Sequence, residues 1–262
     1  MPKIGIDNGH GLNTPGKRTP IFPDGTKSPL TGKNFMHEWE FNHATAKFLE
    51  IELKRCGFET VMLSDTQGDT TLSTRAIRAN QSGCDFVVSI HANAFRGTWG
   101  SATGIETLTY GTGEGLRIGK IINDELVKAT GLPNRGMKDG KWLAIIKQTK
   151  MPTALVECGF MDNLKEAKLL LSTSYRKLCA VAIAKGICKA FNKAYVPEKA
   201  PTPTPKPSAP APKPATSSPS TSTGVFYRVV TGSFKNRDEA EKRMKEIKAK
   251  TGLDSFIVPF KP

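Results

Sequence analysis

The stretch DFVVSIHANA (residues 85–94) places a histidine directly after an apolar run. A buried β-strand is predicted over FVVSI (86–90), because a short uninterrupted apolar run fits a strand that is covered on both faces. His91 ends this run. An imidazole at the end of a buried strand raises the question whether other strands of the chain end in the same way.

Strand-like and helix-like segments alternate through the first 195 residues. Besides 86–90, strands are predicted over residues 3–7, 59–63, 104–110 and 153–156. Helices are predicted over residues 38–56, 72–82, 114–130, 163–171 and 174–194. The alternation predicts an α/β fold with a twisted, mostly parallel sheet and helices on both faces.

Two of these helices carry more detailed predictions. The helix 163–171 is expected to begin with a capping box formed by Asn163 and Glu166. The buried face of the helix 38–56 is expected to consist of Phe41, Ala44, Phe48 and Ile51.

Three predicted strands lead to a side chain that can bind a metal or transfer a proton. His10, His91 and Glu157 follow the first, third and fifth of the strands along the chain. The carboxyl ends of parallel strands lie along one edge of a sheet, where ligands bind. Glu38, at the start of the first helix, can reach this edge through the loop 11–37.

These four residue types suit the chemistry of one catalytic zinc ion. Two histidines and a carboxylate, with an open position for water, form a common zinc shell, which His10, Glu38 and His91 can supply. Glu157 can then take the proton of the water as general base. Structural alternatives stay open, because a histidine after a strand is often a turn residue and an acid favours a helix N-terminus. Three nearby residues also compete with Glu38, namely His37, Glu40 and His43.

The composition changes abruptly after residue 195. Residues 196–224 are nearly all Pro, Ala, Thr, Ser and Lys and contain half of the 18 prolines of the chain. Such a segment cannot bury enough apolar surface to fold and acts as a stiff spacer. We therefore predict a catalytic domain over 1–195, a linker over 196–224 and a small βαβ unit over 225–262. This last unit is below the size at which domains usually fold without help.

The net charge of +14 favours an anionic partner such as the cell wall, a membrane surface or nucleic acid. Nucleic-acid binding is the competing class of function, but we expect none, since the aromatic and basic signature of such modules is missing. No P-loop or Rossmann glycine pattern follows the first strand. The five cysteines lack metal-ligand spacing and predict buried thiols, so Cys158 is not expected to be a nucleophile.

The N-terminal segment MPKIGIDNGH contains an acidic residue and lacks an apolar core, so no secretory signal is expected. No apolar run approaches the roughly 18 residues that a spanning helix needs, so membrane insertion is not expected either. The protein is therefore expected to be made in the cytosol.

Four motifs stand out along the chain, namely GIDNGHG (5–11), EWEFN (38–42), SIHANA (89–94) and VECGFMDNLKEAKLL (156–170). In content and order they resemble those of the type-3 N-acetylmuramoyl-L-alanine amidases, which are zinc enzymes of bacterial sporulation, cell separation and phage lysis. The resemblance covers residues 2–192. It implies that His10, Glu38 and His91 hold zinc and that Glu157 is the catalytic residue. Asn42, four residues after Glu38, favours Glu38 over Glu40 as the ligand.

The chain departs from the family pattern in its first motif and in the loop behind it. Asn8 stands where the family usually has proline, which should alter only the turn before His10. The loop 11–37 is long and basic, and we expect it to shape the access of substrate. Arg75, in a segment where the family carries arginines, is expected to be structural, with substrate contact as the alternative.

Residues 225–262 resemble one βαβ half of a SPOR domain, with a GSF motif between strand and helix. SPOR domains bind peptidoglycan glycan that has lost its peptides, and a complete domain has two halves. A homodimer through residues 225–262 is therefore expected. The alternative is a tail without a ligand. The aromatic residues of the unit can stack on sugars or fill its core, and they are Phe226, Tyr227 and Phe234.

Together the resemblances imply zinc-dependent hydrolysis of the amide between N-acetylmuramic acid and L-alanine in bacterial peptidoglycan, with lysis of the cell wall. A zinc carboxypeptidase or endopeptidase acting on muropeptides is the enzymatic alternative, because its metal chemistry is similar. The enzyme is expected to reach the wall through a phage holin or through lysis of a sporulating mother cell. A phage endolysin is the favoured context, with a sporulation autolysin as the alternative.

Overall fold

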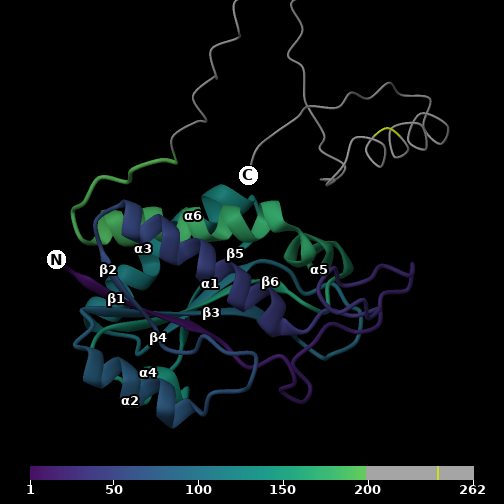
Figure 1. Cartoon of the computed structure of the whole chain (residues 1–262), viewed down its shortest axis with the longest axis horizontal. Coiled ribbons are helices and arrows are strands. Elements are labelled where there is room, and N and C mark those ends of the chain that lie inside the picture. Colours follow the sequence, from purple (N-terminus) through teal and green to yellow (C-terminus); the bar gives the residue numbers. More distant parts are fainter. Residues whose placement is uncertain (199–240, 242–262) are drawn as a thin grey trace, which may run out of the picture. The chain divides into compact units, whose positions relative to one another are not determined.

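The computed structural model of the chain describes residues 1–198 and Glu241 (Figure 1). Its strands are β1 (Lys3–Asn8), β2 (Glu59–Met62), β3 (Phe86–Asn93), β4 (Ile105–Thr109), β5 (Asn134–Asp139) and β6 (Thr153–Phe160). Its helices are α1 (Glu38–Arg55), α2 (Leu72–Ser82), α3 (Gly113–Thr130), α4 (Ala144–Gln148), α5 (Leu164–Leu171) and α6 (Thr173–Ala190). Most of the predicted linker, the predicted βαβ unit and its dimer lie outside the described residues.

The strands form one six-stranded sheet in the order β2-β1-β3-β6-β4-β5. Strands β2, β1, β3 and β6 are mutually parallel, whereas β4 is antiparallel to β6 and parallel to β5. The prediction of a mostly parallel sheet is confirmed. Because β1, β3 and β6 are neighbours with the same direction, their carboxyl-terminal parts meet at one edge. His10 follows β1, whereas His91 and Glu157 lie within β3 and β6, which continue past the predicted ends at residues 90 and 156.

Helices cover both faces of the sheet, as predicted. Figure 1 shows α1, α3 and α6 above the sheet and α2 and α4 below it. Strand β3 separates two apolar clusters, with Phe86, Val88 and Ile90 in the larger one and Val87 in the smaller one. This burial on both faces explains the uninterrupted apolar run that opens the sequence. Among the described helices, none is both long and apolar enough to span a membrane.

The predicted buried face of α1 is confirmed at Phe41 and, in part, at Phe48, which packs against the core, but it is wrong at Ile51. Ile51 is 59% exposed, whereas Phe41, Leu49 and Leu53 are fully buried. The inward face repeats every four residues from Phe41 and includes the buried Thr45, so its apolar periodicity is interrupted. Because the polar Thr45 lies on the inner face, the predicted apolar face is displaced from the observed one by about one residue.

Two elements were not predicted, and one cap differs in part. Strand β5 has the polar sequence NRGMKD at the edge of the sheet, and α4 has only five residues.

At the start of α5, Asn163 accepts hydrogen bonds from the backbone N–H groups of Lys165 and Glu166, as a cap should. The Glu166 carboxylate does not complete the capping box but accepts from the backbone N–H groups of Gly104 and Phe160.

Candidate metal centre and proton-transfer site

His10 lies in a tight turn that follows β1. Its φ of 65° is in the left-handed region, which residues other than glycine rarely adopt. Gly9 packs against the imidazole of His91, since a Cβ added at Gly9 would lie 2.1 Å from the ring carbon Cε1. The backbone N–H of Gly9 also donates to the carbonyl oxygen of Ile90, at 3.1 Å. Glycine is therefore required for the turn to approach the end of β3 this closely.

One carboxylate joins the two predicted histidines. Oε1 of Glu38 lies 3.0 Å from Nδ1 of His91, and Oε2 lies 3.2 Å from Nε2 of His10. The ligand atoms that the three residues offer all lie within 4.8 Å of one another. The structure thus brings together side chains from the turn after β1, the start of α1 and the end of β3.

Backbone and side-chain hydrogen bonds hold Glu38 in place. Nδ2 of Asn42 donates to Oε1 of Glu38 at 3.2 Å and to the carbonyl oxygen of Gly9 at 3.0 Å. The backbone N–H of Ala92 donates to the same Oε1 at 3.2 Å. Asn42 therefore ties helix α1 to the turn that carries His10.

The three competitors of Glu38 have other contacts. Glu40 accepts a hydrogen bond from the backbone N–H of His37 at 2.9 Å and another from the hydroxyl of Ser28. His43 stacks on Trp39, with ring centroids 4.4 Å apart. The imidazole of His37 packs edge-on against Phe35, with ring centroids 5.0 Å apart.

The spacing of the cluster suits a small divalent cation. Zinc takes nitrogen and oxygen ligands at about 2.0–2.2 Å, so neighbouring ligands of a tetrahedral shell lie about 3.3 Å apart. The two nitrogen–oxygen separations of 3.0 and 3.2 Å are close to this value. Three protein ligands leave a fourth position for water or substrate, as in catalytic zinc sites.

Two of the three groups are in the protonation states that bind a cation. Burial, with the charges of His91 and Lys17, lowers the pKa of His10 to about 4. Burial raises the pKa of Glu38, but its contacts with His91 and His10 outweigh this effect and bring the pKa to about 2. Burial lowers the pKa of His91, yet the hydrogen bond with Glu38 leaves it above its usual value. At neutral pH a neutral His10 and an ionised Glu38 are the forms that bind metals.

Glu157 lies beside this cluster, at the position of β6 that pairs with His91 of β3. Its Oε2 is buried and has no hydrogen-bond partner among the described residues. Burial, with the negative charges of Glu38 and Glu106, raises the pKa of Glu157 to about 8. An unpartnered carboxyl group with a raised pKa is suited to accept a proton and return it.

Glu106 was not predicted as part of the site. It lies on β4 directly opposite Glu157. Nδ2 of Asn93 and Nε of Arg135 donate to its two carboxylate oxygens, at 2.7 and 2.6 Å. Arg135 belongs to the unpredicted strand β5, so no local pattern in the sequence could have indicated this contact.

Arg75 is a buried structural residue, as expected. Its Nη1 donates to Oδ1 of Asp7 at 2.7 Å and to the carbonyl oxygen of Asn8 at 2.6 Å. Its Nη2 donates to the carbonyl oxygen of His10 at 2.9 Å and to Oδ1 of Asp69 at 3.1 Å. The guanidinium group thus supports the whole turn that presents His10.

The loop 11–37 is ordered by backbone hydrogen bonds. The N–H of Thr19 donates to the carbonyl oxygen of Met36 at 2.9 Å, and the N–H of Phe22 donates to the carbonyl oxygen of Asn34 at 2.8 Å. At its end, the N–H of Glu38 donates to the carbonyl oxygen of Lys17, also at 2.9 Å. The two arms of the loop therefore pair with each other immediately before the cluster.

The cysteines behave as predicted. All five are buried and free of disulfide bonds. Cys158 is fully buried, and its contact with Cys179 and its burial raise its pKa well above the usual range. A thiol in this environment is a poor nucleophile, which removes the cysteine-hydrolase alternative.

Comparison with known families gives two matches along the chain. A family profile described as N-acetylmuramoyl-L-alanine amidase matches residues 4–189, which span the whole sheet and the cluster. A profile of the SPOR domain matches residues 209–259. The second match begins before residue 225, within the segment that we predicted as linker.

Individual relatives agree with the profiles. The amidase CwlM of Bacillus licheniformis is 32% identical over 196 residues, covering 73% of this chain and 70% of its own. The sporulation-specific amidase of Bacillus subtilis (strain 168) is 26% identical and covers 98% of this chain and 85% of its own. A crystal structure of an N-acetylmuramoyl-L-alanine amidase from Clostridium difficile 630 superposes with a TM-score of 0.63. It is 27% identical and covers 73% of this chain and 97% of its own.

Proposed function

Since the chain belongs to the N-acetylmuramoyl-L-alanine amidase family, we propose that it hydrolyses its substrate with one zinc ion held by His10, Glu38 and His91. The enzyme acts on peptidoglycan, and the bond cleaved joins the lactyl carbonyl of N-acetylmuramic acid to L-alanine. The observation that carries the zinc proposal is the spacing of the Glu38 carboxylate, 3.0 Å from one imidazole nitrogen and 3.2 Å from the other.

The residues of the chain divide the reaction between them. When bound, zinc supplies a Lewis acid that polarises the carbonyl group and lowers the pKa of water. Glu157 takes a proton from the attacking water on its free Oε2. The water oxygen adds to the carbonyl carbon, and the carbon–nitrogen bond breaks. Glu157 returns the proton to the departing nitrogen, which leaves as the amino group of L-alanine.

The proposal is tested on purified peptidoglycan with zinc-loaded full-length protein. Released peptides that begin with L-alanine, together with intact glycan strands, support it when the release stops on chelation and resumes with zinc. Mass spectrometry identifies these products. Shortened peptides with an intact bond between muramic acid and alanine would instead indicate a carboxypeptidase or endopeptidase.

The role of Glu157 has a separate test. The Glu157→Ala variant should bind zinc as tightly as the unaltered protein and lose turnover, because no ligand has been removed. Zinc content by atomic absorption and peptide release are measured on the same sample. Loss of metal in parallel with activity would assign Glu157 to the ligands instead.

We further propose that the region matched by the SPOR profile (residues 209–259) and the net positive charge of the chain keep the enzyme on the cell wall. We also propose that its action lyses the wall. Exposed charges are screened over about 10 Å at 0.1 M salt, so binding to purified walls should weaken as salt rises. Binding that does not change with salt would contradict this proposal. We propose that the protein forms a homodimer through residues 225–262. We also propose that a holin or lysis of the mother cell releases the enzyme from the cytosol to the wall.

A further inference from the structure

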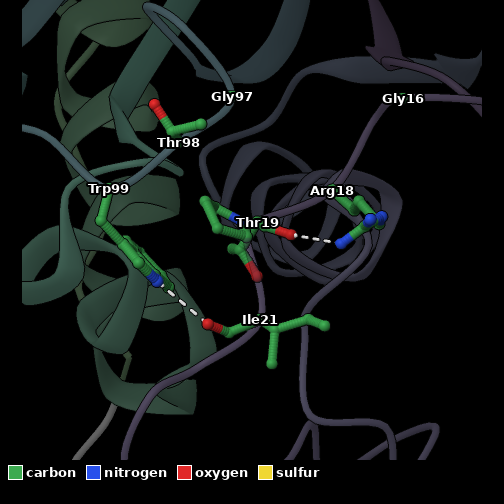
Figure 2. A pocket seen from close by; sticks show the side chains of 8 residues that line it. Gly16, Arg18, Thr19, Ile21, Gly97, Thr98 and Trp99 are labelled. Carbon is green, nitrogen blue, oxygen red and sulfur yellow. Dashed lines mark hydrogen bonds between the residues drawn. The ribbon is translucent and has the colours of Figure 1, made fainter.

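The structure has cavities at both edges of the sheet. The cavity in Figure 2 lies between the loop 11–37, which ends at Glu38, and the loop 94–100, which follows β3, so it lies towards the edge that carries the cluster. A second cavity, of about 310 Å³, lies at the opposite edge. We propose that this second cavity binds a linear anionic polymer whose units are joined by phosphate groups, such as a polyol phosphate chain of the cell wall. The proposal goes beyond the hydrolysis of peptidoglycan, in which this cavity takes no part.

The pairing of β4 with β6 fixes the position of the second cavity. The two strands are antiparallel, with Thr109 opposite Ala154, so Tyr110, which follows β4, lies at the amino end of β6. Tyr110 and Thr153 both line the cavity. Glu157 lies further along β6, about 13 Å from Thr153 at about 3.3 Å per residue. A ligand in this cavity therefore leaves the metal-binding edge free.

The lining of this cavity carries uncompensated positive charge. Lys147 and Lys150 line it and are exposed, and neither side chain forms an ion pair or a hydrogen bond within the described residues. The one acid of the lining, Glu114, is paired with Arg117, whose Nη2 lies 2.8 Å from Oε2 of Glu114. The two ammonium groups are therefore available to an anion.

A third lysine lies next to the cavity. Nζ of Lys141 is 5.6 Å from the ring centroid of Tyr110, which is 53% exposed. A cation–π contact of this kind holds the ammonium group near the ring. Within the described part of the chain, Lys141 forms no ion pair either. Three ammonium groups at one cavity suit a ligand with several negative charges rather than a single one.

The segment that carries two of these lysines is held by helix α2. Nδ2 of Asn80 donates to the carbonyl oxygen of Gln148 at 2.9 Å, and Oδ1 of Asn80 accepts from the backbone N–H of Lys150 at 2.8 Å. The hydroxyl of Thr149 donates to the carbonyl oxygen of Ile145 at 2.7 Å. The backbone beneath the lysines is thus fixed before any ligand binds, which lowers the entropic cost of binding.

The residue types of the lining indicate the kind of anion. Lysine binds phosphate as a point charge, without the fixed geometry of a guanidinium group, and the lining contains no arginine. Its apolar residues Met151 and Pro152 suit the carbon atoms between successive phosphates. Single strands of nucleic acid also carry phosphates, but their bases stack on aromatic side chains. Tyr110, the one aromatic residue of the lining, is already in contact with Lys141.

Calorimetry with a synthetic glycerol phosphate oligomer and the zinc-loaded full-length protein tests the site. The Lys147→Ala, Lys150→Ala double variant should raise the Kd about tenfold, since an exposed charged contact contributes a factor of about three. The Lys128→Ala, Lys165→Ala double variant is the matched control. It removes the same net charge from two exposed lysines of α3 and α5 that are not part of the lining, so the Kd should stay nearly unchanged.

The other outcomes are distinct. Equal affinities of the two double variants would overturn the site, because binding would then follow net charge alone. Tighter binding of single-stranded DNA than of the oligomer, weakened by the same two substitutions, would assign the cavity to nucleic acid instead. Inorganic phosphate that binds as tightly as the oligomer would overturn the assignment to a polymer. Binding that depends on Lys147 and Lys150 supports the site whether or not the protein cleaves peptidoglycan, because the ligand is not the substrate.

Discussion

Nη2 of Arg75 donates a hydrogen bond of 2.9 Å to the backbone carbonyl oxygen of His10, the residue whose φ of 65° presents one proposed zinc ligand. A non-glycine residue in the left-handed region costs about 1–2 kcal/mol. Arg75 offsets this cost, since the same guanidinium group also binds Asp7 and Asn8. The ligand geometry therefore depends on a residue that belongs to helix α2 and touches no ligand side chain.

Replacing Arg75 with leucine should cost about 3–5 kcal/mol of stability, because the carboxylate of Asp7 is then buried without its cation. At temperatures where the variant stays folded, zinc affinity should also fall, since the His10 turn is released. Urea unfolding and a zinc competition titration measure the two effects. Arg78→Ala is the control, because Arg78 lies on the same helix and its side chain, among the described residues, donates to the carbonyl oxygen of Leu63 alone. Equal zinc affinities in the two variants would contradict the positioning role.

Gly9→Ala should displace the imidazole of His91, because the added Cβ would lie 2.1 Å from a ring carbon. Zinc affinity is expected to fall at least about tenfold, with about 1–3 kcal/mol of lost stability from overpacking. Gly68→Ala is a matched control, since a Cβ there meets no atom within 4 Å. If both variants retain full zinc affinity, the close packing of Gly9 does not determine the position of His91.

The strands other than β5 could be predicted, because each of them is rich in apolar or β-branched residues. The edge strand β5 could not, since NRGMKD lies at a solvent-exposed edge and needs no apolar face. The buried face of α1 was predicted only in part, because it includes Thr45, whose burial depends on packing against distant elements. The apolar periodicity of a segment predicts burial only where the buried side chains are themselves apolar.

The cluster itself was predictable, because His10, His91 and Glu157 each follow a recognisable strand and the strand ends share one edge. The network around it was not. Glu106 becomes relevant to Glu157 only through the antiparallel pairing of β4 with β6, which no short motif encodes. The contact between the loops 11–37 and 94–100 likewise depends on residues far apart in the chain, since Nε1 of Trp99 donates to the carbonyl oxygen of Ile21.

Asn42→Ala should weaken zinc binding by about 10–100-fold, the usual effect of removing a hydrogen bond that orients a ligand. Asn42 holds both Glu38 and the carbonyl oxygen of Gly9, so its loss releases the ligand and the turn together. Isothermal titration with zinc measures the change. Thr45→Val on the same helix is the control, because Thr45 is buried and its hydroxyl has no partner among the described residues. An effect no larger than that of Thr45→Val would rule out the orienting role.

The raised pKa of Glu157 predicts how stability depends on pH in the presence of a chelator. The folded protein keeps the carboxyl proton up to about pH 8, whereas in the unfolded chain the pKa of this group has its usual value of 4.5. Between these values the folded state binds more protons, so the free energy of unfolding falls as pH rises, by at most about 1.4 kcal/mol per pH unit. Glu157→Gln cannot ionise and should lack this contribution.

The comparison with Glu157→Gln between pH 6.5 and 8 isolates the effect, because His91, whose pKa is also raised, titrates in both proteins. The lowered pKa of His10, about 4, makes stability rise with pH only below about 6.5. Urea denaturation of the unaltered protein and of Glu157→Gln across this window should therefore give stability differences that grow with pH. A bound cation favours the ionised carboxylate, so adding zinc should reduce the slope of this difference. A constant difference in the chelated protein would mean that Glu157 is already ionised at pH 6.5, and its environment would then not hold the proton that the reaction transfers.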